Sequence, residues 1–309
     1  MSAVWDEAKG IYDVKVNVDG QEIEDWCHVL VNGTGFLNDW KWPKIPGLHD
    51  FQGTLLHSAN WDTSVDYSDK SVAVIGTGSS AIQIVPQVQK KAKHLTTFMR
   101  SVTWISPVVG DAEIEELKAK HAPTTAKDKQ DESQLVKQYW YTEEEKQRFR
   151  DDPEYLLLYR KTLESTVNSL FDLFVSGSDV SKASHDMMKA EMIRRIGPGH
   201  EELKEKLIPK WSPGCRRLTP GDGYLEALVK PNVTTVHEEI EKIVPEGLVD
   251  ASGKLHKVDI IACATGFNIA FAPPFEVIGR NGTSMKKEFD PEPNVYLAMA
   301  VPKFPVSPQ

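Results

Sequence analysis

The segment Val72-Ala73-Val74-Ile75-Gly76-Thr77-Gly78-Ser79-Ser80-Ala81 joins a short apolar run to two closely spaced glycines. A continuous apolar run rich in β-branched residues is typical of a buried strand in a parallel sheet. The residues that follow, Ala81 to Lys91, predict a helix, and Leu95 to Arg100 predict the next strand. The pattern therefore predicts a strand-helix-strand unit of the Rossmann type within an α/β fold.

The glycine turn has the composition of a dinucleotide-binding loop. Gly76 allows the tight bend after the strand, Gly78 leaves room for a pyrophosphate, and the small Ala81 lets the helix pack closely on the strand. A phosphate bound there would lie at the positive end of the helix dipole. We predict a cofactor site made by Gly76, Thr77, Gly78, Ser79, Ser80 and Ala81, with a purely structural turn as the alternative. No other loop of this type occurs in the 309 residues.

The end of the second strand indicates which coenzyme binds. An NAD-binding unit usually places Asp or Glu there, to bond the ribose. This chain carries Arg100 and Ser101 instead. The planar guanidinium of an arginine pairs well with a 2′-phosphate, so we predict NADP(H) with Arg100 and Ser101 as ligands. The alternative is a solvated arginine at the strand end.

Composition excludes several classes of function. Thirty-six basic against 45 acidic side chains give a net charge of −9, which argues against nucleic acid or an anionic membrane surface as the main partner. No apolar run approaches the roughly 20 residues that a membrane-spanning helix needs, and the first residues lack the features of a secretory signal. Cys27, Cys215 and Cys263 lie far apart, which predicts no metal site and a reducing, cytoplasmic location.

The flanking sequence predicts the rest of the organisation. Tyr12 to Val18 alternates and turns at Asp19-Gly20, so we expect a hairpin, followed by a strand at Val29 to Val31. Strand patterns return after residue 209, at residues 233–236, 240–244 and 258–267. We expect the sheet that stops near residue 105 to resume there.

Residues 111–206 form a charged block with helical spacing, which predicts a helical insertion. Helices are expected over residues 113–120, 143–150, 155–174 and 181–196, the last ending at Gly197-Pro198. The third should have one apolar face that packs on a core, made by Leu156, Tyr159, Leu163, Val167, Leu170 and Phe174. A membrane-surface helix is the alternative, which the acidic flanks disfavour.

The residues before the glycine turn carry a second motif, Phe51-x-Gly53-x-x-x-His57-x-x-x-Trp61-Asp62. It resembles the fingerprint of the Baeyer–Villiger monooxygenases. The related flavin monooxygenases that oxidise nitrogen and sulfur usually carry Tyr or Phe at the last aromatic position, so Trp61-Asp62 favours the Baeyer–Villiger group. In that family the fingerprint connects the two dinucleotide domains, which implies a hinge or hydrogen-bonding role for His57.

Two further segments are similar to the same family. The stretch from Gly214 to Glu226 contains the basic pair Arg216-Arg217, and its amino-acid sequence is most similar to the fungal secondary-metabolism branch of the family. The resemblance implies that Arg217 is the catalytic arginine, with a surface or phosphate-pairing role as the alternative. Residues 264–267, Ala-Thr-Gly-Phe, match the stretch where such chains return to the flavin domain.

The resemblance implies a reaction and a domain layout. FAD and NADPH would serve as cofactors, and O2 would convert a ketone into an ester or lactone. The fold class would be α/β, a two-dinucleotide-binding-domain flavoprotein with an incomplete FAD domain, because only 50 residues precede Phe51 and none forms the FAD loop. The predicted parts are residues 1–66 as FAD domain and linker, 67–108 with 209–250 as the NADP domain, 109–208 as the insertion, and 251–309 as the return to the FAD domain.

Three functions stay open at this point. The chain is a Baeyer–Villiger monooxygenase, a catalytically incomplete NADP-binding remnant or partner-dependent fragment, or a monooxygenase that oxidises nitrogen or sulfur. An incomplete FAD domain would expose an apolar sheet edge, so we expect a protein partner or self-association.

Overall fold

The computed structural model describes residues 1–106, 114, 116–117, 141–269, 271–297 and 299–305. The chain forms two compact units. The smaller joins Met1–Pro43 to Thr265–Gln309, and the larger comprises Lys44–Ala264. These limits do not follow the predicted boundaries at 66/67 and 250/251, because residues 54–57 and 260–263, outside the predicted NADP domain, belong to the same sheet as the strand before the glycine turn.

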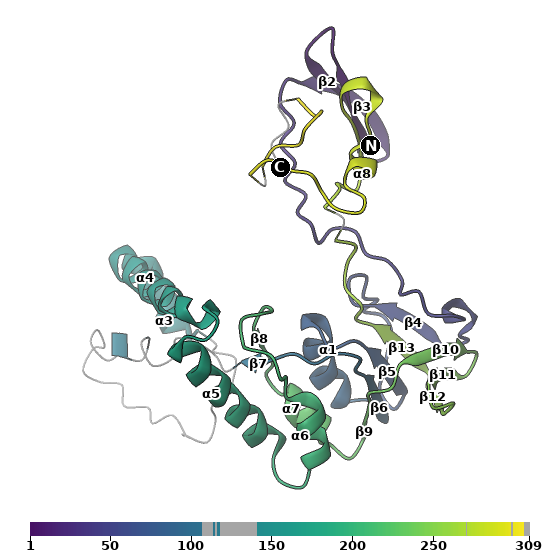
Figure 1. The fold of residues 1–309 in the computed structure, drawn as a ribbon, viewed down its shortest axis with the longest axis vertical. Helices are drawn as coiled ribbons and strands as arrows, with labels where there is room; N and C mark the ends of the chain where they lie inside the picture. The colour runs from purple at the N-terminus through teal and green to yellow at the C-terminus, as the bar shows by residue number, and fades with distance from the viewer. Residues whose placement is uncertain (107–113, 115, 118–140, 270, 298, 306–309) are drawn as a thin grey trace. The chain divides into compact units, whose positions relative to one another are not determined.

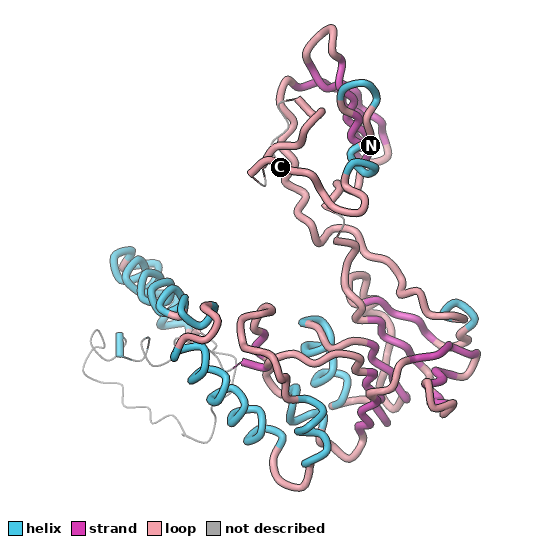
Figure 2. The backbone as a smooth tube through the Cα atoms, in the orientation of Figure 1, coloured by secondary structure: helices cyan, strands magenta, loops and turns pink. Residues whose placement is uncertain are grey.

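That sheet has five parallel strands in the order β4-β13-β5-β6-β9. Figure 2 draws the strands in magenta. They are β4 (Thr54–His57), β5 (Ser71–Ile75), β6 (His94–Phe98), β9 (Val233–Val236) and β13 (Ile260–Cys263). Val72 to Ile75 are all buried, as expected of a strand covered on both faces. Since β9 pairs with β6 and β13 pairs with β5, the prediction that the sheet resumes after the helical block is confirmed.

The strand order reverses beside β5. From β5 the chain moves through α1 to β6 and β9, and it then returns to β13 on the other side of β5. Ligands of open α/β sheets bind at the carboxyl ends of the strands where the order reverses in this way. The position lies between the ends of β5 and β13, directly at the glycine turn.

Helices and short sheets complete the larger unit. Helix α1 (Ser79–Gln89) begins two residues before the predicted start and buries Ala81, Ile82, Val85, Pro86 and Val88. Helix α7 (Tyr224–Leu228) packs against α1 (Figure 1). The remaining strands are β7 (Ile105–Ser106) paired with β8 (Thr219–Pro220), and an antiparallel sheet of β10 (Ile240–Val244), β11 (Gly247–Asp250) and β12 (Leu255–Lys257). A short 3-10 helix, η1 (Leu48–Asp50), precedes β4.

The helical block contains α3 (Glu143–Asp151), α4 (Pro153–Ser169), η2 (Phe171–Phe174), α5 (Asp179–Ile196) and α6 (Glu201–Leu207). Helix α5 ends at Gly197, whose φ of 79° places it in the left-handed region, as predicted. The prediction of one helix over 155–174 is wrong, because α4 ends at Ser169. The predicted helix over 113–120 lies mostly outside the described residues.

The expected apolar face of this helix does not form a buried surface. Of its six residues only Tyr159 is buried, while Val167 is 59% exposed and Phe174 is 62% exposed. Tyr155, which lies outside the predicted set, is the second buried residue of α4. The apolar spacing predicts a core contact, but among the described residues only Tyr159 and Leu163 of this set pack in a small cluster, with Ile114, Leu117 and Phe149.

The smaller unit is a four-stranded sheet in the order β14-β1-β2-β3. Its strands are β1 (Ser2–Asp6), β2 (Ile11–Val18), β3 (Gln21–Cys27) and β14 (Glu276–Ile278), accompanied by η3 (Arg280–Gly282) and α8 (Met285–Glu288). The hairpin turn has φ of 52° at Asp19 and 85° at Gly20, which confirms the predicted turn. The predicted strand at Val29 to Val31 is wrong: the segment has no strand pairing, and both valines are exposed.

Candidate functional site

The first glycine of the turn lies in close contact with the neighbouring strand. Gly76 has φ of 127°, and a Cβ added to it would come within 2.4 Å of the Ala264 carbonyl oxygen. Its N–H donates to the Phe98 carbonyl at 3.1 Å, and the Ala264 N–H donates to the Ile75 carbonyl at 2.9 Å. Gly76 therefore lies where β5, β6 and β13 end together, and the site accepts no side chain.

The second glycine lies in open space. Gly78 is the N-cap of α1, with φ of −80°, and no described atom lies within 4 Å of the position that a Cβ would occupy. No side chain of the described residues caps the helix, and its first turn, fully described, has no acidic residue. The first N–H groups of an α-helix have no partner within the helix, and they carry its positive partial charge. This end of α1 therefore offers donors and space to an anion.

The predicted coenzyme residues lie at this same edge of the sheet. The Thr77 hydroxyl is 3.2 Å from the Ser101 hydroxyl, so the structure joins the turn to the end of β6. Arg100 is exposed, two residues beyond β6. Ser79 is exposed and Ser80 half-buried, whereas Ala81 is fully buried against the sheet.

A small pocket opens beside these hydroxyl groups. Thr77 and Ser101 line it, together with Met192 of α5 and Tyr224 and Leu225 of α7. Burial raises the pKa of the Tyr224 hydroxyl. The pattern of the sequence did not identify the α5 and α7 residues as part of the site, because the helical block separates Met192 from the glycine turn in the chain.

At the start of the fingerprint, the Phe51 ring packs closely against Gly53. Phe51 is buried, and a Cβ on Gly53 would come within 2.5 Å of the Phe51 ring and 2.3 Å of the Asp259 carbonyl oxygen. The next N–H, from Thr54, donates to the same carbonyl at 3.0 Å and begins β4. Phe51 and Gly53 thus fix the start of the edge strand next to β13.

His57 is the last residue of β4 and is 1% exposed. The Ala59 N–H donates to its Nδ1 at 3.2 Å, which places the proton of the neutral ring on Nε2. Burial lowers the pKa of His57, so the ring is neutral at neutral pH. In the sheet register Cys263 pairs with both His57 and Ile75, so one strand separates His57 from the glycine turn.

The end of the fingerprint forms a local turn. Asp62 accepts hydrogen bonds from the Ser64 hydroxyl at 2.6 Å and from the Ser64 N–H at 2.9 Å. These bonds lower the pKa of the Asp62 carboxyl group. Trp61 is half-buried and packs against the core of the larger unit.

Arg217 is exposed, in the segment between α6 and β8. Within the described part of the chain, no hydrogen bond or ion pair joins its guanidinium group to the glycine turn. The segment does approach the turn two residues later, where the Thr219 hydroxyl lies 3.5 Å from that of Ser79. The guanidinium carbon of the preceding Arg216 lies 5.9 Å from the centre of the Trp211 ring.

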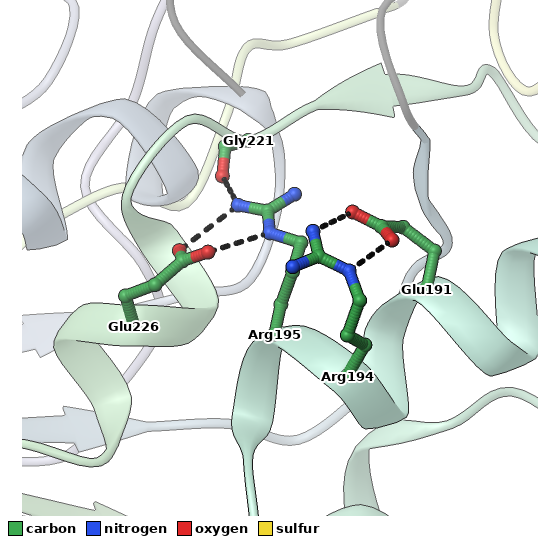
Figure 3. Close-up of polar contacts among 5 residues, drawn as sticks. All are labelled: Glu191, Arg194, Arg195, Gly221 and Glu226. Carbon is green, nitrogen blue, oxygen red and sulfur yellow. Dashed lines mark hydrogen bonds and ion pairs between the residues drawn. The ribbon is translucent and has the colours of Figure 1, made fainter. Parts of the chain in front are cut away.

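A buried ion pair next to the pocket, between Arg195 and Glu226, was not predicted from the sequence. The side chain of Arg195, on α5, is 1% exposed and donates two hydrogen bonds to Glu226 of α7, at 2.8 Å and 3.0 Å (Figure 3). It also donates to the Gly221 carbonyl. Desolvation would raise the pKa of Glu226, but the hydrogen bonds from Arg195 contribute to a net lowering. The sequence shows only an Arg-Arg pair near a helix end.

The described residues do not offer two other kinds of site. Among the described residues no cluster of three His, Cys, Asp or Glu side chains could hold a metal ion. In the same part of the chain no helix is both long and apolar enough to cross a membrane.

Known proteins resemble this chain in sequence and fold. A family model described as flavin-binding monooxygenase-like matches residues 5–119. The FAD-binding monooxygenase tazF of Aspergillus terreus is 40% identical over 305 residues, which are 99% of this chain and 51% of that protein. A Baeyer–Villiger monooxygenase of Pseudomonas aeruginosa is 30% identical over 302 residues, 97% of this chain and 51% of that protein. The chain spans about half the length of these curated relatives.

A crystal structure of cyclohexanone monooxygenase from Rhodococcus sp. Phi1 bound to NADP+ shares the fold. The TM-score is 0.70 at 24% identity, over 99% of this chain and 59% of that chain. This match confirms the predicted α/β fold class of the two-dinucleotide-domain flavoproteins. The family match, together with the identity to tazF and to the Baeyer–Villiger monooxygenase of Pseudomonas aeruginosa, shows that the chain belongs to the flavin-binding monooxygenase-like family.

Proposed function

We propose that this chain binds NADP(H) at the turn between β5 and α1, as part of an FAD- and NADPH-dependent monooxygenase. The observation that carries the proposal is the open space at Gly78, in front of an uncapped helix end at the point where the strand order reverses. These are the features that a pyrophosphate needs. The solved relative described as bound to NADP+ supports the same coenzyme.

Each residue of the turn has a distinct role in this proposal. Gly76 permits the strand ends to meet, Gly78 leaves space for the pyrophosphate, and the first N–H groups of Ser79, Ser80 and Ala81 donate to it. Thr77 and Ser101 contribute hydroxyl groups at the pocket. Arg100, exposed beyond β6, pairs with the 2′-phosphate and selects NADPH over NADH.

We infer that the reaction is the Baeyer–Villiger oxidation of a ketone to an ester or lactone with O2. The support is the fingerprint, with Trp61-Asp62 at its end, and the similarity to relatives named as Baeyer–Villiger monooxygenases. The resemblance of residues 214–226 to the fungal secondary-metabolism branch favours a bulky ketone as the substrate. Bound NADPH would supply the hydride that this chemistry requires.

Arg217 is assigned to the oxygenation step. A guanidinium group holds its charge at every relevant pH, so it stabilises negative charge on oxygen without giving up a proton. His57, neutral and buried at the end of β4, serves instead as a hydrogen-bonding residue at the hinge. The described residues form one glycine turn of the required kind, so we assign no residue of this chain to FAD.

A second candidate function is binding of NADP(H) without oxygenation, either as a remnant or together with a protein partner. Partner binding or self-association is supported by exposed apolar side chains in the smaller unit, including Trp26, Phe36 and Leu37. The predicted cytoplasmic location stays a prediction.

One experiment separates the two functions. The purified 309-residue chain is mixed with FAD and NADPH, and the flavin spectrum and the NADPH consumption are recorded with and without a ketone. Bound flavin with ketone-dependent NADPH consumption and an ester product would refute the binding-only function. NADP+ binding without any flavin binding would refute catalysis by the chain alone.

A further inference from the structure

Arg195 forms a buried connection among three segments of the larger unit. From α5, its Nε and Nη2 atoms donate to the two carboxylate oxygens of Glu226 on α7, and Nη2 also donates to the Gly221 carbonyl (Figure 3). Nη1 is buried and has no acceptor among the described residues. The connection therefore depends on the other two nitrogens, and we name it the α5–α7 clamp, made of Arg195, Glu226 and Gly221.

The residues of the clamp adjoin the walls of the pocket beside the glycine turn. Met192 lies one helical turn before Arg195 on α5, and Leu225 directly precedes Glu226 on α7. Both line the pocket together with Thr77 and Ser101. Because residues three positions apart on a helix share a face, a shift of Arg195 would carry Met192 with it.

The third member of the clamp touches the helix that begins at the glycine turn. A Cβ on Gly221 would come within 3.0 Å of Cγ2 of both Ile82 and Ile105, so this loop is packed tightly. Ile82 is in the first turn of α1, and its N–H donates to the Gly78 carbonyl at 3.0 Å. Gly221, whose carbonyl accepts from Arg195, therefore packs against Ile82, and Ile82 is hydrogen-bonded to Gly78 of the proposed phosphate-binding turn.

The neighbouring arginine shows what an ordinary ion pair looks like here. Arg194 donates two hydrogen bonds to Glu191, at 2.8 Å and 2.7 Å, but both residues belong to α5 and the Arg194 side chain is 54% exposed. That pair connects no separate segments. The two adjacent arginines have the same chemistry but differ in burial and in what they connect.

We propose that Arg195 is a positioning residue for NADP(H), which holds α5 and α7 against the glycine turn so that the pocket has its binding shape before the coenzyme arrives. The inference rests on the proposed function. A planar fork that satisfies a carboxylate and a carbonyl together is not reproduced by the single ammonium group of lysine. Loss of the clamp would therefore lower affinity for the coenzyme even when the charge is kept.

The test compares four forms of the full chain: wild type, Arg195→Met, Arg195→Lys and the matched control Arg194→Met. Circular dichroism melts define a temperature at which each is folded, and isothermal titration there gives the dissociation constants for NADP+ and NAD+. We expect both Arg195 variants to bind NADP+ about tenfold more weakly, a change of about 1.4 kcal/mol. Arg194→Met should stay within about twofold of wild type.

A purely structural role would lower the melting temperature of the Arg195 variants and leave the dissociation constants of the folded proteins unchanged, which would overturn the proposal. Both Arg195 variants should also keep the wild-type ratio of NADP+ to NAD+ affinity, because the clamp does not touch the 2′-phosphate residue Arg100. If Arg195→Met fails to fold, Arg195→Lys and Glu226→Gln carry the test, with the same expected weakening. Failure of wild type to bind NADP+ would refute the proposed function itself, and the clamp proposal with it.

Discussion

Alanine substitutions at Gly76 and Gly78, two positions apart in the same turn, should have opposite consequences for stability and for coenzyme binding. In Gly76→Ala the new methyl group would lie 2.4 Å from the Ala264 carbonyl oxygen, on a backbone with φ of 127°. An L-residue in such a conformation costs about 1–3 kcal/mol. The contact must also be relieved by separating β5 from β13, which strains the hydrogen bond from Ala264 to Ile75.

In Gly78→Ala the methyl group meets no described atom within 4 Å, and φ of −80° suits alanine. Loss of chain entropy in the unfolded state favours alanine by about 0.4–1 kcal/mol, while alanine is a poorer N-cap than glycine by a comparable amount. The stability of Gly78→Ala should therefore stay within about 1 kcal/mol of wild type. The methyl group would nevertheless occupy the space assigned to the pyrophosphate.

Urea unfolding followed by circular dichroism, and titration with NADP+ at a temperature where the proteins are folded, measure the two effects. We expect Gly76→Ala to lose about 3 kcal/mol or more of unfolding free energy. Gly78→Ala should be nearly as stable as wild type but bind NADP+ at least about tenfold more weakly, or about 1.4 kcal/mol. A Gly78→Ala variant that binds NADP+ as tightly as wild type would refute the assignment of this space to the coenzyme.

Three further substitutions test individual residues. Arg100→Ala should weaken NADPH binding much more than NADH binding in parallel titrations, and equal losses would count against the 2′-phosphate role. Arg217→Ala should reduce ester formation by about 10²- to 10³-fold while anaerobic flavin reduction by NADPH continues; unchanged ester yield by gas chromatography would remove Arg217 from the mechanism. Burial lowers the pKa of His57 in the folded protein, so at acid pH the unfolded chain takes up a proton on this imidazole more readily than the folded chain does. His57 therefore reduces the free energy of unfolding as the pH falls below its ordinary pKa of 6.5. His57→Gln should show a smaller loss of unfolding free energy between pH 7 and pH 5 than wild type in urea titrations; an identical loss would show that His57 does not contribute.

Local patterns were sufficient where a few adjacent residues determine the backbone. The run from Val72 to Ile75, the two glycines and the Asp19-Gly20 turn each specify a conformation through their own chemistry, and the structure has the strand, the turn and the hairpin there. The helix stop at Gly197 is of the same kind. In these segments the sequence predicts the structure without knowledge of distant contacts.

Long-range packing explains what was missed. The short strand β4 belongs to the five-stranded sheet because it pairs with β13, which follows it by about two hundred residues, so the predicted boundary at 66/67 divided that sheet. Arg195 and Glu226 are 31 residues apart, and their burial depends on how α5 and α7 meet. The apolar spacing of α4 predicted a buried face, but periodicity alone does not show whether another segment covers it.

The central claim is that this chain binds NADP(H) at the turn between β5 and α1. Isothermal titration of the purified 309-residue chain with NADP+ and with NAD+ tests it most directly. We predict saturable binding of one NADP+ per chain, tighter than that of NAD+ and weakened by Gly78→Ala. No measurable binding of NADP+ to the folded chain, or equal binding by wild type and Gly78→Ala, would contradict the account.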